Sequence, residues 1–107
     1  MDINDLTWHD GILHELSINF HSEEGLKIHV ALPVNLLSTE RKSFAVFVKN
    51  PTRLFSNIDV AGLIDNQRSG NISDAKIFHE NGVRFLLILL EGYLEVMGET
   101  IHVSPID

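Results

Sequence analysis

Three side chains that could transfer protons or bind a metal ion lie close together near the start of the chain. They are His9, Asp10 and His14, in the stretch WHDGILHEL, which also holds the only tryptophan, Trp8. Imidazole and carboxylate groups are the ligands available to a metal site when the chain has no cysteine. A small metal-dependent enzyme built on His9, Asp10 and His14 is therefore one hypothesis for the function.

The spacing of these residues argues against a shared site. The stretch around His14 alternates apolar and polar residues with a period of two, which is typical of a half-buried β-strand. On one continuous strand His9 and His14 point to opposite faces, unless the chain bends at Gly11. We expect the two histidines to point apart, with His14 as a hydrogen-bonded core residue. We also expect Trp8 to fill the core, with its indole N–H bonded at the rim.

Other catalytic signatures are missing from the sequence. The chain has no cysteine, which excludes disulfides and thiolate chemistry. None of the serines lies in the Gly-x-Ser-x-Gly motif that presents a nucleophile. The stretch RSGNISD, residues 68–74, has too few glycines for a phosphate-binding loop. The sequence therefore favours a protein without enzymatic activity and without a cofactor.

Acidic residues outnumber basic ones, which bears on the partners and the location of the protein. Fifteen Asp and Glu against eight Lys and Arg give a formal net charge of -7. The basic residues are scattered, and nucleic-acid binding, which needs a positive face, is disfavoured. The longest apolar run, residues 85–90, is far shorter than the roughly 20 residues of a membrane-spanning helix. The first ten residues lack the pattern of a signal peptide, so we expect a cytoplasmic protein without membrane contact.

The first third of the chain predicts a β-hairpin. Apolar residues alternate over residues 12–20 and again over residues 26–32, on either side of a turn-like stretch. The pattern predicts that Phe20 lies opposite Leu26. In this register His29 lies among polar side chains and is exposed.

The centre of the chain predicts one strand and one short helix. Residues 43–49 alternate as a strand. In the segment that follows, Ser56 and Asp59 resemble the start of a helix, and Gly70 lies just beyond its expected end. No separate strand is predicted between residues 50 and 59.

The last third of the chain predicts a three-stranded meander. Asn81-Gly82 is a strong signal for a two-residue hairpin turn, and it predicts that Phe78 faces Phe85. A second turn is expected at Glu91-Gly92. The strand between the two turns is apolar on both faces, so we expect both faces of the sheet to be covered there, one by the helix and one by the N-terminal hairpin.

These elements predict a single domain over residues 1–107. We expect an α+β fold that is mainly β, either a single antiparallel sheet or a partly closed barrel of about six to seven strands, with one short helix. The last run, residues 100–106, is expected to form an edge strand. Because an exposed edge strand can pair with a second copy, a homodimeric scaffold is a further hypothesis.

The order of these motifs resembles small bacterial immunity proteins of polymorphic and contact-dependent toxin systems. The resemblance rests on the Trp-His-Asp opening before the first strand, WHDGILHELSI, and on the C-terminal meander, GNISDAKI followed by FLLILLEGYLEV. It implies a cytoplasmic inhibitor that binds the toxin domain, a protein partner, and blocks its active site. It assigns no catalytic residues.

Exposed carboxylates are the candidates for contacting such a partner. An acidic inhibitor of a basic nuclease toxin could present side chains that mimic phosphates. The candidates are Glu15, Glu23, Glu24, Asp65 and Asp74. The alternative is that these charges only solvate the surface.

Overall fold

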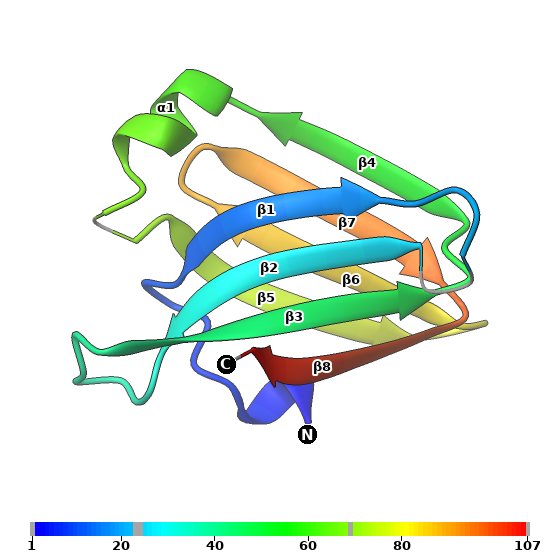
Figure 1. Ribbon diagram of the computed structural model, residues 1–107, viewed down its shortest axis with the longest axis horizontal. Coiled ribbons are helices and arrows are strands. Elements are labelled where there is room, and N and C mark those ends of the chain that lie inside the picture. Colours follow the sequence, from blue (N-terminus) through cyan, green and yellow to red (C-terminus); the bar gives the residue numbers. More distant parts are fainter. Residues whose placement is uncertain (1, 23–24, 69, 107) are drawn as a thin grey trace.

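The computed structural model describes residues 2–22, 25–68 and 70–106, which form two antiparallel β-sheets of four strands each (Figure 1). The mainly β class predicted from the sequence is confirmed. The strands are β1 (Ile12–Ile18), β2 (Leu26–Pro33), β3 (Arg41–Lys49), β4 (Arg53–Ile58), β5 (Ile72–His79), β6 (Val83–Leu89), β7 (Gly92–Gly98) and β8 (Thr100–Ile106). The helices are a short 3-10 helix, η1 (Ile3–Asp5), and an α-helix, α1 (Val60–Asp65).

The two sheets face each other as a sandwich instead of forming the single sheet or partly closed barrel of six to seven strands that the sequence suggested. Sheet A has the strand order β1-β2-β3-β8, and sheet B has the order β4-β7-β6-β5. The chain passes from one sheet to the other between β3 and β4, and again between β7 and β8, at the same end of the molecule (Figure 1). Alternation of residue types shows where strands lie but does not show where the chain changes sheet.

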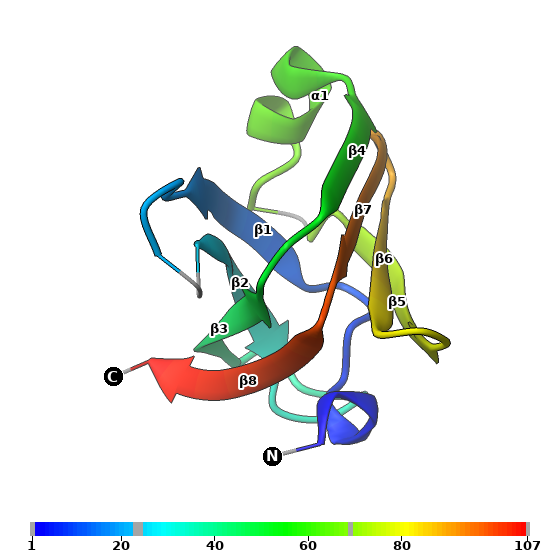
Figure 2. The same cartoon turned by 90° about the vertical axis from the view of Figure 1, so that its right-hand side faces the viewer.

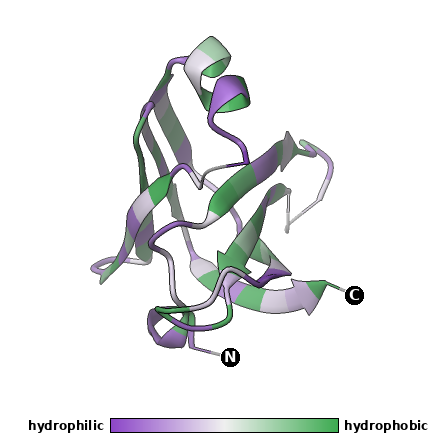
Figure 3. Ribbon diagram, turned by 90° about the vertical axis from the view of Figure 1, so that its left-hand side faces the viewer, coloured by the Kyte–Doolittle hydropathy of each residue, from purple (hydrophilic) through white to green (hydrophobic). Residues whose placement is uncertain are grey.

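Apolar side chains on the facing sides of the two sheets form the core. The view along the sheets shows the two layers, with α1 beside β4 (Figure 2). Apolar and polar residues alternate along the strands, as the ribbon coloured by hydropathy shows (Figure 3). The strands contribute Leu13, Leu26, Ile28, Val30, Leu32, Phe44, Val46, Val48, Ile72, Phe85, Leu87, Leu89, Leu94, Val96 and Val103 to this core. Burying one such large side chain is worth about 1.5–3 kcal/mol.

The hairpin of β1 and β2 forms as predicted, but in a different register. Ile18, not Phe20, lies opposite Leu26, and Phe20 lies in the turn with 89% of its surface exposed. The turn is closed by a hydrogen bond from the Asn19 N–H to the Gly25 carbonyl oxygen. The predicted turn was therefore two residues too short on the β1 side. The acidic candidates Glu23 and Glu24 lie outside the described residues.

The segment before the helix is a strand, β4, which the sequence interpretation missed. Ser56 lies in β4 and does not begin the helix. Asp59 does begin it, since its side chain accepts a hydrogen bond from the Gly62 N–H and caps the first turn. The helix α1 has only six residues, none of them buried. The prediction that the helix covers a sheet face was therefore wrong. No helix in the described part of the chain is long and apolar enough to cross a membrane.

The meander of β5, β6 and β7 is present, but both of its registers differ from the prediction. The second turn lies at Leu90-Glu91 instead of Glu91-Gly92, since Leu89 is paired with Gly92. The first register is shifted by one residue. Ile77 lies opposite Phe85, and Phe78 lies opposite Arg84. In the first turn, Asn81 and Gly82 have positive φ, at 55° and 108°. This turn holds three residues, Glu80, Asn81 and Gly82, instead of two, because His79 is paired with Val83. As a result Phe78 points away from the core, onto the outer face of sheet B.

Candidate functional site

The stretch with His9 and Asp10 lies at a junction between the two sheets. Asp10 has a φ of 66° and turns the chain into β1, and its N–H donates to the Ile72 carbonyl oxygen at the start of β5. The Gly11 carbonyl oxygen accepts hydrogen bonds from the N–H groups of Asn71 and Ile72, each 2.9 Å long. The sequence left open a bend at Gly11. The chain bends one residue earlier, at Asp10, and this bend joins β1 to β5.

Asn71 completes this junction, and sequence reasoning assigned it only to a loop. Its side chain is fully buried, and its Oδ1 accepts a hydrogen bond of 3.0 Å from the Leu13 N–H. Its own carbonyl oxygen accepts one from the Leu90 N–H. A buried amide with these backbone partners holds three segments in place. The only signal in the sequence was its position between a glycine and an apolar strand.

His9 and Asp10 form an exposed pair beside the junction. The His9 Nε2 lies 3.7 Å from the Asp10 Oδ1, and the His9 Nδ1 is 3.2 Å from the Ser73 carbonyl oxygen. The Asp10 carbonyl oxygen accepts a hydrogen bond of 3.0 Å from the Arg41 Nε. Exposed pairs of this kind contribute little to stability.

Trp8 fills the core next to this junction, as predicted. Its ring lies against Phe85 with 5.6 Å between ring centroids, and its indole N–H donates to the Ile3 carbonyl oxygen. The residue is 7% exposed. It therefore anchors the N-terminal segment to sheet B.

His14 is exposed on the outer face of sheet A, so the prediction that it is a core residue was wrong. A β-bulge between Leu13 and Glu15 places both His14 and Glu15 on the outer face, whereas regular alternation would turn His14 inward. The His14 ring lies against the ring of His29 with 4.9 Å between centroids. His9 and Asp10 thus lie together, and His14 pairs with His29 instead.

The pKa of His29 lies below its ordinary value. Partial burial disfavours the charged imidazolium, and the positive charges of His14 and Lys27 add to this effect. Glu15 faces His29 from β1, and its negative charge counteracts this lowering of the pKa. The His29 Nε2 is buried and has no hydrogen-bond partner in the described part of the structure.

The predicted metal or proton-transfer site does not form as a single cluster. Within residues 2–22, 25–68 and 70–106, no group of three or more His, Asp or Glu side chains is close enough to hold a metal ion. Instead, His9 and Asp74 line a shallow hollow of about 350 Å³ together with Trp8. Chemistry shared by His9, Asp10 and His14 has no geometric support.

The acidic candidates lie on separate parts of the surface. Glu15 is on the outer face of sheet A, Asp74 is on β5 of sheet B, and Asp65 is the last residue of α1. Glu23 and Glu24 lie outside the described residues. The three described candidates, Glu15, Asp65 and Asp74, therefore do not form one contact surface.

The outer face of sheet B is rich in apolar and aromatic side chains. The strand registers place six of them on it: Phe55 on β4, Tyr93 and Met97 on β7, Leu86 and Ile88 on β6, and Phe78 on β5. The same rows also hold six polar or charged residues, Arg53, Asn57, Asp74, Lys76, Arg84 and Glu95. The three aromatic residues are 39–43% exposed, and the other three apolar residues are half-buried. No element of the described chain packs over this face, which we call the outer apolar face (Figures 1 and 2).

Arg84 is fixed on this face by two contacts. Its guanidinium lies 4.3 Å from the centroid of the Phe78 ring, and its Nη1 lies 3.8 Å from the Glu95 Oε2. A cation over an aromatic face is stabilised by the ring electrons. These contacts hold the long Arg84 side chain in one orientation.

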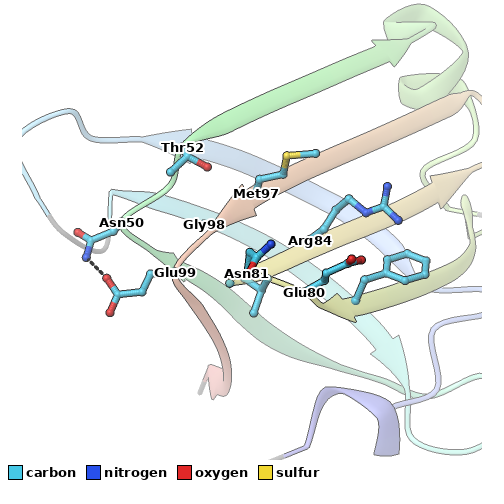
Figure 4. A pocket seen from close by; sticks show the side chains of 11 residues that line it. Asn50, Thr52, Glu80, Asn81, Arg84, Met97, Gly98 and Glu99 are labelled. Atoms are coloured by element: carbon cyan, nitrogen blue, oxygen red, sulfur yellow. Dashed lines mark hydrogen bonds between the residues drawn. The ribbon is translucent and has the colours of Figure 1, made fainter.

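A groove of about 700 Å³ continues the outer apolar face at the turn between β5 and β6. Phe78, Arg84 and Met97 line both the face and the groove. The polar wall includes Asn50 and Glu99, whose side chains are hydrogen-bonded at 2.6 Å (Figure 4). The face and the groove are therefore one surface.

The sequence held a signal for this surface that was interpreted differently. The middle strand β6 is apolar on both faces, a pattern that predicts that both sides of the sheet are covered. Leu86 and Ile88 are instead half-buried among their own neighbours on the sheet. Tyr93 and Phe55 occupy outward positions, which the period-two pattern would fill with polar residues.

The fold and this surface define a class of protein, a small β-sandwich with an apolar outer sheet face. Comparison of the chain with protein-family models, with curated proteins and with solved structures gives no match. The assignment of a function therefore rests on the residues of the chain itself.

Proposed function

We propose that this protein is a non-enzymatic binding protein that holds a partner protein on the outer apolar face of sheet B. The observation that carries this proposal is the set of three partly exposed aromatic residues, Phe55, Phe78 and Tyr93, on one sheet face without a covering layer. Contiguous apolar patches on a monomer mark interaction sites, because exposing them to water is unfavourable. A partner that covers the patch removes this cost.

The residue types on the face fit a protein interface. Tyrosine, phenylalanine, methionine and arginine are enriched in interface centres, whereas lysine and glutamate are depleted. Tyr93, Met97 and Arg84 belong to the enriched group, whereas Lys76 and Glu95 on the same face belong to the depleted one. Because these side chains stand on paired strands and Arg84 is already held by Phe78 and Glu95, little conformational freedom is lost on binding.

The partner class follows from the charge and from the resemblance to immunity proteins. A net charge of -7 accelerates association with a basic protein through long-range attraction. A toxin domain that acts on nucleic acid is a basic protein of this kind. We therefore propose that the protein acts in the cytoplasm as an immunity protein, which neutralises a toxin domain by direct binding.

Co-expression with the protein encoded by the neighbouring gene tests this function. The chain is expected to protect cells from that protein and to co-purify with it as a one-to-one complex. Tyr93→Glu and Phe78→Glu, which place charges on the outer apolar face, are expected to abolish both effects. Leu37→Glu makes the same chemical change at a side chain that is 96% exposed elsewhere, and it is expected to keep both. Failure of both protection and co-purification would contradict the proposal.

A further inference from the structure

Three of the four sheet edges are protected against pairing with another strand. At the β1 edge, the Leu13 N–H donates to the Asn71 Oδ1 and the Leu13 carbonyl oxygen accepts from the Gln67 Nε2. At the β5 edge, the first carbonyl groups are bonded by Asp10 and His9, and a bulge follows. The β8 edge carries Pro105, which cannot donate a hydrogen bond.

The fourth edge, β4, has none of these devices. Its register with β7 is continuous, and it contains neither proline nor lysine. In the described part of the chain, no side chain or loop bonds the outward backbone groups of Arg53–Ile58. Arg53 is its only charged residue. A regular and uncovered edge with a single charge at its start is a template for a further strand.

Exposed apolar side chains lie at both ends of this edge. At the end of β4, α1 exposes Val60 and Ile64, which are 61% and 65% exposed. At the start of β4, a groove of about 460 Å³ is lined by Ile18, Phe20, Leu26, Pro51 and Leu54, among others. The helix and the turn between β1 and β2 lie at opposite ends of β4, on the same side of the molecule (Figure 1).

We propose that two copies of this chain pair through β4, with α1 of each copy seated on the groove of the other. A two-fold axis through the middle of β4 makes the paired strands antiparallel and extends sheet B to eight strands. The same axis exchanges the two ends of β4, so the helix of one copy meets the groove of the second. Val60 and Ile64 thereby cover Ile18 and Phe20 of the second copy.

Charge complementarity favours a second copy over an unrelated strand. In the register centred on Ser56, Leu54 lies opposite Ile58, and Arg53 lies opposite Asp59 of the second copy. The only charge of the strand thus meets an opposite charge, and this contact occurs twice in the pair. Opposite charges on facing strands stabilise a strand pair, whereas like charges destabilise it.

The size of this interface predicts a weak, reversible dimer. A strand of six residues is about 20 Å long. With two helix–groove contacts, the pair buries on the order of 800 Å² in total, below the roughly 1,200–2,000 Å² of stable complexes. We therefore expect the dissociation constant of the dimer to be roughly 10–100 μM.

Sedimentation equilibrium of the purified full chain tests the dimer. The average mass is expected to rise from that of one chain towards that of two between about 5 μM and about 1 mM, a range that brackets the expected constant. Ile64→Glu, which places a charge in the groove, and Ser56→Pro, which removes a donor from the middle of β4, are expected to remain monomeric. Leu37→Glu is expected to dimerise like the unchanged chain.

Two results would overturn the dimer. One is the mass of a single chain throughout this range, and the other is unchanged association of Ile64→Glu. The Ile64 side chain is mostly exposed, so this variant is expected to fold and decides the question even where Ser56→Pro does not fold. Tyr93→Glu is expected to dimerise normally, because Tyr93 lies on β7, which does not take part in the strand pairing of the two copies. Failure of the dimer and failure of the proposed function are therefore distinguishable.

Discussion

At the scale of single residues, Asn71 and His29 carry interactions that can be tested without knowledge of a partner. Asn71 lies at the junction of β1 and β5, and His29 lies on the outer face of sheet A. Both are polar residues in partly or fully buried positions. Such positions respond strongly to substitution, because a lost hydrogen bond or an added charge is not replaced by water.

Replacement of Asn71 by alanine is expected to destabilise the fold. The Leu13 N–H would lose its acceptor in the interior, which costs about 1–3 kcal/mol. The free energy of unfolding in urea measures the effect. Asn57→Ala, at an exposed amide on β4, serves as the control and should change it by less than about 0.5 kcal/mol. Equal stability of the two variants would show that the Asn71 amide does not hold the junction.

His29 is expected to make the fold less stable in mild acid. Its pKa is lowered in the folded state relative to the ordinary value of 6.5, so the unfolded chain binds the proton more readily. The contribution of neutral His29 to the free energy of unfolding is fully present above pH 6.5 and is lost as the pH falls through the lowered pKa of His29. His29→Gln, which stays neutral, is expected to reduce the loss of unfolding free energy on acidification. An unchanged pH dependence in this variant would contradict the assignment.

The neighbour of His29 offers a second readout. The positive charge of His14 is one cause of the lowered pKa of His29. His14→Ala is therefore expected to raise the pKa of His29 towards its ordinary value in an NMR titration. Glu15→Gln is expected to shift it in the opposite direction, because Glu15 favours the charged form. Shifts of the same sign in both variants would be inconsistent with this account.

At the scale of elements, the turns decide the registers. Gly92 begins β7 with a φ of 139°, and a side chain there would collide with the Asn57 carbonyl oxygen of the neighbouring strand. Gly92→Ala is expected to lower the free energy of unfolding by more than about 1 kcal/mol. Asn81→Gly, which keeps a residue suited to its φ of 55°, is expected to leave stability nearly unchanged. Thermal unfolding of both variants checks this contrast.

The same turns explain how much of the fold could be predicted from the sequence. The alternation of apolar residues located seven of the eight described strands, because one buried face is enough to produce it. It missed β4, where Phe55 points outward and Ser56 inward. The length of the turn at Asn81 and the bulge at His14 are not determined by the alternation of apolar and polar residues, so the predicted registers were shifted.

The candidate site was harder to predict than the strands. His9 and His14 lie apart as expected, but strand parity is not the reason, because His9 lies in the turn before β1. The bulge turned His14 outward to meet His29. The outer apolar face could not be found without strand order, because Phe55 and Tyr93 lie almost forty residues apart in the chain and meet only through the pairing of β4 with β7. Contacts across a sheet depend on topology, which a local pattern does not contain.

At the scale of the whole molecule, the sandwich leaves one sheet face and one sheet edge uncovered. The outer apolar face carries the proposed partner site, and the β4 edge carries the proposed dimer contact. In the dimer the two outer apolar faces would lie side by side on one extended sheet. Each dimer could then hold two partner molecules, one on each copy.

The central claim is that the outer apolar face binds a toxin domain. Calorimetric titration of the chain with the purified product of the neighbouring gene tests this claim most directly. The product is made inactive beforehand by mutation of its own catalytic site. We predict a one-to-one complex that Tyr93→Glu weakens at least about 30-fold, as expected for an aromatic anchor worth about 2 kcal/mol. Leu37→Glu is predicted to leave the affinity unchanged. Equal affinity of the Tyr93→Glu variant and the unchanged chain, or no binding by either, would contradict the claim.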